Sequence, residues 1–79
     1  MIKKAIEQYE EYLKNIVDLI NFAKAEAELF DDLDKMLDFY QGMAYGAYQM
    51  LINLYPALTN DADEISAKWD EKIREAVKG

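Results

Sequence analysis

Carboxylates gather in one short stretch of this 79-residue chain and are its clearest candidates for chemistry. Asp31, Asp32 and Asp34 lie almost side by side, and Asp38 follows about one helical turn later. Oxygen ligands of this kind bind Ca²⁺ or Mg²⁺. The spacing is not that of an EF-hand, because no Gly stands at the bend and no Glu closes a loop. We therefore interpret these residues as the capped, solvated start of a helix rather than as a metal site.

The other residue types give enzymatic chemistry little support. The chain contains no His and no Cys, and Ser66 is its one serine. That hydroxyl therefore has no imidazole to activate it, and the Glu-x-x-His motif of di-iron helical bundles is absent from the sequence. Asp61, Asp63 and Glu64 fit the first turn of a helix, where acids complement the helix dipole. We predict a protein that is not an enzyme and has no catalytic residue, metal or cofactor.

The charge balance favours protein partners over nucleic acid. Sixteen acidic against nine basic residues give a net charge of −7 and a pI near 4.4. Phosphate backbones are bound by clusters of Lys and Arg, so we expect no direct nucleic-acid binding. An acidic chain suits a protein partner with a basic surface. Acids interrupt the N-terminal segment where a signal peptide would be apolar, which predicts a cytoplasmic protein.

Apolar residues recur in steps of four and three along most of the sequence, as on amphipathic helices. The length allows one domain, residues 1–79. The first stripe is Ile2, Ile6, Tyr9, Leu13, Ile16, Ile20, Ala23, Ala27 and Phe30, widened by Tyr12, Val17 and Leu19. The second is Leu33, Leu37, Tyr40, Ala44, Ala47, Leu51 and Leu54. The third is Ala62, Ile65, Trp69, Ile73, Ala76 and Val77.

These stripes predict an all-α, three-helix, up-down-up bundle with helices at about 2–30, 32–55 and 60–78. The first two stripes are out of phase between Phe30 and Leu33, which indicates a turn there. Pro56 ends the second helix. Asp61 and Glu64 have the spacing of a capping box for the third. The alternative is one long helix over 2–55 that buries its stripe in an intertwined dimer.

The second helix has an uncharged face where a bundle helix normally carries charge. The segment Phe39–Asn60 contains no Asp, Glu, Lys or Arg. Gly42 and Gly46 each destabilise a helix by about 1 kcal/mol relative to Ala. Three explanations are open: the other helices cover this face, a second copy does, or a foreign protein does. The candidate partner or dimer interface, here called the second stripe, is Phe39, Gly42, Tyr45, Gly46, Gln49, Ile52 and Asn53.

The same segment is long enough to span a membrane, but its composition opposes that interpretation. Gln41, Gln49 and Asn53 lie within it, and Lys or Arg do not flank it as anchors. We therefore expect no membrane partner.

Acidic residues concentrate around the predicted first turn. This acidic pole consists of Glu26, Glu28, Asp31, Asp32, Asp34 and Asp38. In an up-down-up bundle the end of the third helix returns to it and brings Lys72, Arg74 and Lys78, which neutralise part of the charge. The pole is either ordinary surface or a binding site for a basic partner.

The overall build resembles a group of known proteins. A chain of under 80 residues, acidic, free of Cys and all-helical, with a central helix such as DKMLDFYQGMAYGAYQML, is similar to small accessory proteins of phages and mobile elements of Gram-positive bacteria. Anti-CRISPR inhibitors are among these. The resemblance concerns the build of the whole chain and carries over no site residue. It implies a stoichiometric binder, in the host cytoplasm if phage-encoded. Because some anti-CRISPR proteins mimic the charge of DNA, it makes the acidic pole a candidate surface.

Taken together, the sequence predicts a small non-catalytic protein-binding module. The preferred hypothesis is a stoichiometric inhibitor of a larger protein that handles nucleic acid. The alternative hypothesis is a homodimeric helical module that joins through the second stripe.

Overall fold

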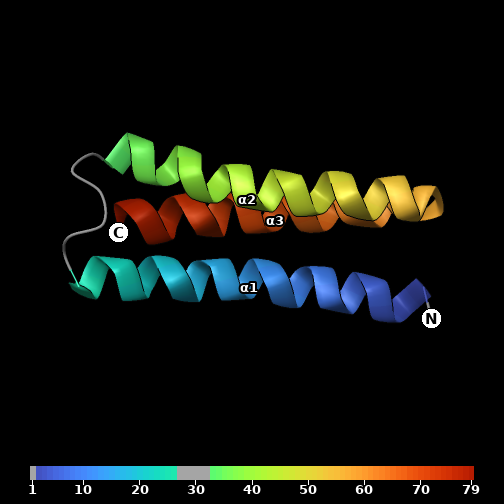
Figure 1. Ribbon diagram of the computed structural model, residues 1–79, viewed down its shortest axis with the longest axis horizontal. Coiled ribbons are helices and arrows are strands. Elements are labelled where there is room, and N and C mark those ends of the chain that lie inside the picture. Colours follow the sequence, from blue (N-terminus) through green and yellow to red (C-terminus); the bar gives the residue numbers. More distant parts are fainter. Residues whose placement is uncertain (1, 27–32) are drawn as a thin grey trace.

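Three helices, each antiparallel to the one before it in the chain, form the protein in a computed structural model, which describes residues 2–26 and 33–79 (Figure 1). They are α1 (Ile2–Glu26), α2 (Leu33–Leu54) and α3 (Thr59–Lys78), with the short 3₁₀ turn η1 (Pro56–Leu58) before α3. The chain runs up, down and up, so that the C-terminus lies near the end of α1 and the N-terminus near the end of α2. This arrangement confirms the predicted all-α three-helix bundle. The intertwined dimer with one long helix stays a prediction.

Proline sets the corner between α2 and α3. The residue before a proline avoids the helical region, and Tyr55 accordingly has φ −134° and ψ 75°. Pro56 then opens η1, and the Thr59 hydroxyl donates a hydrogen bond to its carbonyl at 2.7 Å. The predicted capping box is wrong. Because α3 continues directly from η1, its N-cap is Leu58, without a side-chain cap, and Asp61 lies inside the first turn.

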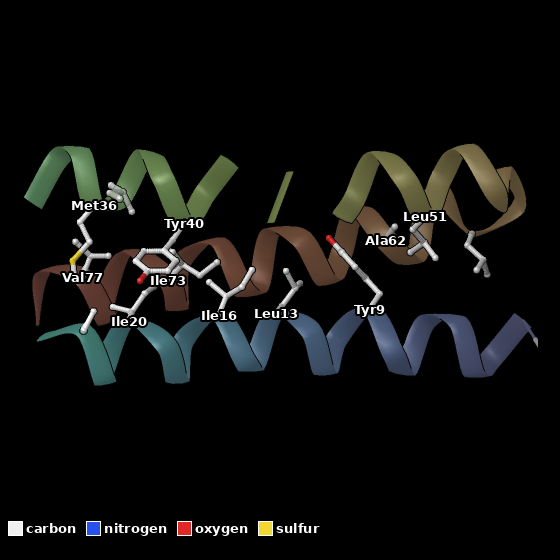
Figure 2. Packing of buried hydrophobic residues seen from close by; sticks show 13 residues of the cluster. Tyr9, Leu13, Ile16, Ile20, Met36, Tyr40, Leu51, Ala62, Ile73 and Val77 are labelled. Carbon is white, nitrogen blue, oxygen red and sulfur yellow. The ribbon is translucent and has the colours of Figure 1, made fainter. Parts of the chain in front are cut away.

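The three predicted stripes meet along the axis of the bundle (Figure 2). Tyr9 and Tyr40 point inward from α1 and α2, and Ile20 and Ile73 are completely buried between the helices. One predicted core residue of α2 lies elsewhere: Leu54 is 67% exposed, because the chain turns away after it and Leu58 fills the core at this corner. The buried apolar residues are Tyr9, Leu13, Ile16, Ile20, Ala23, Met36, Leu37, Tyr40, Leu51, Leu58, Ala62, Ile73 and Val77.

Polar contacts tie α3 to α1. The indole Nε1 of Trp69 donates to Glu10 Oε2 at 2.8 Å, and Lys68 Nζ donates to the same oxygen at 3.2 Å. Further along, Lys24 Nζ donates to the carbonyl of Ala76 at 2.9 Å. The hydrogen bond from Trp69, helped by that from Lys68, lowers the pKa of Glu10 below its usual range. These contacts fix which side of α1 faces α3.

A second set of polar contacts ties α3 to α2. Gln41 Nε2 donates to Asp70 Oδ1 at 2.8 Å, while Arg74 Nε donates to the other oxygen of Asp70 at 3.2 Å. The Tyr48 hydroxyl donates to Asp63, and this hydrogen bond raises the pKa of the Tyr48 phenol. Helix α3 is therefore joined to both of its neighbours by polar contacts as well as by the apolar core.

Two leucines that the sequence placed in the same core should differ strongly in their effect on stability. Leu13→Ala should lower the free energy of unfolding by about 2 to 5 kcal/mol, because Leu13 is 1% exposed and its truncation leaves a cavity. Leu54→Ala should lower it by less than about 1 kcal/mol, because most of that side chain already contacts water. Urea denaturation of both variants measures the difference. Equal losses of unfolding free energy in the two variants would contradict the exposed position of Leu54.

The Glu10 contact should also appear in the pH dependence of stability. The pKa of Glu10 is lower in the folded than in the unfolded chain, so its stabilising effect is present above the unfolded pKa near 4.5. It is lost as the pH falls through the lower, folded value. The stability difference between the wild type and Glu10→Gln should therefore be largest at neutral pH and shrink on acidification. Urea titrations across this range test it, with the exposed Glu7→Gln as control. A difference that is constant with pH would contradict it.

Candidate functional site

A groove of about 670 Å³ runs between α1 and α2. Tyr12 of α1 and Gly46 and Met50 of α2 line it, and its floor includes the core residues Tyr9 and Leu51. Every residue that lines the groove belongs to α1, to α2 or to the corner after α2, so the groove opens away from α3. The lining residues are Ala5, Gln8, Tyr9, Tyr12, Gly42, Met43, Gly46, Ala47, Met50, Leu51, Leu54 and Tyr55.

The two mid-helix glycines of α2 lie in this groove and are not required by the packing of the monomer. Among the described residues, nothing beyond the local helix backbone lies within 4 Å of a Cβ atom placed on Gly42 or Gly46. Small residues in a helix usually let another helix approach closely, but here no neighbour occupies that space. The chain therefore accepts the helix-destabilising effect of two glycines without any packing benefit inside the single copy.

The second stripe of α2 does not form one surface. Gly42 and Gly46 line the α1–α2 groove. Tyr45 instead lines a smaller hollow beside α3, together with Ser66 and Trp69, and accepts a hydrogen bond from Gln49 at 2.8 Å. Of the rest, Phe39 and Asn53 are exposed, Gln49 is half-buried, and Ile52 is half-buried against the core. The structure thus divides the predicted interface between two sides of α2.

Helix α1 carries another row of residues beside its core stripe, and this row was not predicted from the sequence. Its members are Ala5, Gln8, Tyr12, Asn15, Leu19 and Phe22. They recur in steps of three and four, and each directly precedes a residue of the core stripe, so they share one face of the helix. Tyr12, Leu19 and Phe22 are 39%, 47% and 62% exposed. The spacing is visible in the sequence, but it runs one residue beside the core stripe, so Tyr12 and Leu19 also fit a wider core.

The α1–α2 face, as named from here on, carries most of the large exposed apolar side chains among the residues that the structure describes. It comprises Gln8, Tyr12, Asn15, Leu19 and Phe22 of α1 with Phe39, Gly42, Met43, Gly46, Met50, Asn53, Leu54 and Tyr55 from α2 and its end. Among the described side chains, eight large hydrophobic ones are exposed, and all but Tyr45 belong to this face. Exposed apolar side chains that gather on one side of a protein are typical of interaction surfaces, and we therefore take this face as the candidate site.

The acidic pole lies mostly outside the described residues. Glu28, Asp31 and Asp32 are not described, nor are the side chains of Glu26 and Asp34, whereas Asp38 is exposed on α2. The pole therefore stays a prediction.

Two of the three basic residues expected to return to the acidic pole make contacts within α3. Arg74 pairs with Asp70, and Lys72 lies over the Trp69 ring with its Nζ 5.4 Å from the centroid. Lys78 is exposed.

The phenol of Tyr9 is buried in the core, and Asp61, Asp63 and Glu64 lie at the start of α3. Burial raises the pKa of Tyr9, with a nearby Ser66 hydroxyl opposing the shift. Asp63 accepts the hydrogen bond from Tyr48. Within residues 2–26 and 33–79, no group of three or more acidic side chains is placed to hold a metal ion.

None of the helices that the structure describes combines the length and the apolar character that crossing a membrane requires. Comparison of the chain with protein-family models, with curated proteins and with solved structures finds no match.

Replacing a groove glycine by alanine should stabilise the protein. Because the added methyl group meets open space, Gly46→Ala should raise the free energy of unfolding by about 0.5 to 1 kcal/mol through helix propensity alone. The reverse change at an exposed position of α3, Ala67→Gly, should lower it by a similar amount. Chemical denaturation at a protein concentration below any self-association measures both. A destabilised Gly46→Ala variant would show that the glycine serves the packing of the monomer.

Proposed function

We propose that this protein is a small non-catalytic protein-binding module that acts by occupying a larger protein stoichiometrically, and that its interface is the α1–α2 face. The observation that carries the proposal is the groove with its two open glycines. A chain that keeps glycine at two mid-helix positions, where alanine would fit, gives up about 1 to 2 kcal/mol of stability. A partner that packs against the bare backbone is the physical reason for keeping them.

The composition of the face also fits a protein partner. Tyr, Phe and Met are enriched in protein interfaces, whereas Lys and Glu are depleted there. The α1–α2 face offers Tyr12, Phe22, Met50 and Tyr55 in exposed positions, and no charged residue lines the groove at its centre. Rigid aromatic side chains around a central groove are the usual anchors of binding energy.

The larger partner that we propose is one that handles nucleic acid, and the effect that we propose is inhibition or redirection of its activity. Net charge supports this choice, because proteins that bind nucleic acid carry basic surfaces, and a chain of −7 is attracted to them at long range. In this proposal the acidic pole steers the encounter, and the apolar face supplies the affinity of the complex.

A charged residue in the groove should separate binding from folding. Gly46→Arg adds a long cation to the apolar groove, while its Cβ meets open space, so the fold should be retained. Affinity for the target should fall at least about 100-fold, because the cation must lose its water on binding. Ala67→Arg, at an exposed position on α3, is the matched control and should bind like the wild type.

A photo-crosslinking amino acid at position 50 first captures the target in cells of the organism that encodes the protein. The captured target is then purified, and its dissociation constant is measured by titration calorimetry. Circular dichroism checks that both arginine variants are folded. If the wild type and Gly46→Arg bind the purified target with the same dissociation constant, the α1–α2 face is not the interface and the proposal fails.

A further inference from the structure

We infer that in the free protein a second copy of the chain covers the α1–α2 face, so that self-association and target binding exclude one another. The inference rests on the proposed function, because it concerns the same face. It states which protein covers that face before the target binds. Three features of the face favour a copy of the same chain over a foreign basic segment: its charges, its size and the position of its glycines.

The distribution of charge is the first argument. In a two-fold symmetric contact each residue meets the same surface patch, so a charged patch would meet its own sign. In this chain of −7 the groove itself is lined by no charged residue, while Glu11 and Asp18 of α1 and Lys35 of α2 adjoin the face by their helical spacing. A neutral groove meets an identical copy of itself without repulsion between like charges.

The polar side chains of the face also suit a contact between two identical copies. They are amides: Gln8 and Asn15 on α1 and Asn53 on α2, all exposed. An amide side chain both donates and accepts hydrogen bonds, so it can pair with an identical group across a symmetry axis. Carboxylates and ammonium groups cannot do this. The polar groups of the face are therefore self-complementary as well as neutral.

Size is the second argument. The bundle measures 39 × 18 × 17 Å between Cα atoms, so one long face covers about 700 Å². Two such faces would bury about 1,400 Å² in total, which lies within the range of about 1,200 to 2,000 Å² for specific protein pairs. The area is therefore sufficient for a pair of copies but does not imply a permanent assembly.

The position of the glycines is the third argument. Gly42 and Gly46 lie close to the middle of α2, which runs from Leu33 to Leu54. In an antiparallel pair, a two-fold axis through the middle of the face brings these positions nearest to their counterparts. Glycine allows two backbones to approach most closely at that point. The open space above Gly46 is thus where a second copy would come closest.

The test is the molar mass in solution, by light scattering after size exclusion, from about 5 to about 500 μM protein. The wild type should change with concentration from the monomer mass of 9.2 kDa toward twice that value. Gly46→Arg should stay at 9.2 kDa at every concentration, and Ala67→Arg should follow the wild type. Circular dichroism confirms folding of both variants.

Two results would overturn the inference: a wild type that stays monomeric throughout, or a dimer that Gly46→Arg leaves intact. Failure of the proposed function looks different. If the wild type is monomeric and Gly46→Arg loses target binding, the dimer is ruled out but the proposed target interface stands. If Gly46→Arg dissociates the dimer but binds the target with unchanged affinity, the dimer stands and the proposed target interface is ruled out. If an amphipathic helix of a basic protein binds the groove while the wild type stays monomeric, the occupant is foreign and the inference is wrong.

Discussion

Burial of one narrow apolar stripe on each helix is the constraint on which the rest of this structure depends. Three helices around a common axis can hide one side of each helix, and the buried residues from Tyr9 to Val77 occupy those sides. The polar contacts of Glu10 with Trp69 and of Gln41 with Asp70 then fix how α3 lies against its neighbours. Once α3 is placed, the opposite junction between α1 and α2 has no further helix to cover it.

That open junction is where the chain departs from an ordinary bundle. Helices α1 and α2 each carry apolar or neutral residues beyond the side that they bury, and the excess lies on one face. Gly42 and Gly46 weaken α2 without improving its packing within the monomer. A face that is apolar, uncharged and glycine-lined makes the single copy less stable and less soluble than it could be. Binding of another protein surface would recover both losses, which supports the proposal that this face binds a protein.

Much of the fold could be predicted from the sequence because periodicity and proline act locally. The four-three spacing from Tyr9 to Ala23 placed the core side of α1, and Pro56 placed the end of α2 within one residue. Leu54 was misplaced because a helical pattern cannot show that the chain leaves the bundle axis at the next residue. The capping box at Asp61 failed because η1 runs directly into α3 and removes the need for a side-chain cap.

The candidate site was harder to predict, for a geometric reason. A spacing pattern shows that Gly42, Tyr45 and Gly46 share one side of α2, but not from which direction α1 and α3 approach that helix. The structure places Tyr45 beside α3 and the glycines beside α1. The stripe on α1 was visible as a second four-three pattern, but it merges with the core pattern one residue away. The positions of α2 and α3 decide which of the two rows on α1 faces the core.

The most direct test of the α1–α2 face as the interaction surface is a dilution series of ¹³C-methyl methionine NMR spectra. Met50 lies on the face and is 65% exposed, whereas Met36 is buried in the core and 5% exposed. The account predicts that the Met50 methyl signal shifts with protein concentration and loses its accessibility to a soluble paramagnetic agent, while the Met36 signal stays constant. A Met50 methyl that keeps its shift and its accessibility, both at the highest concentration and with purified target bound, would contradict it.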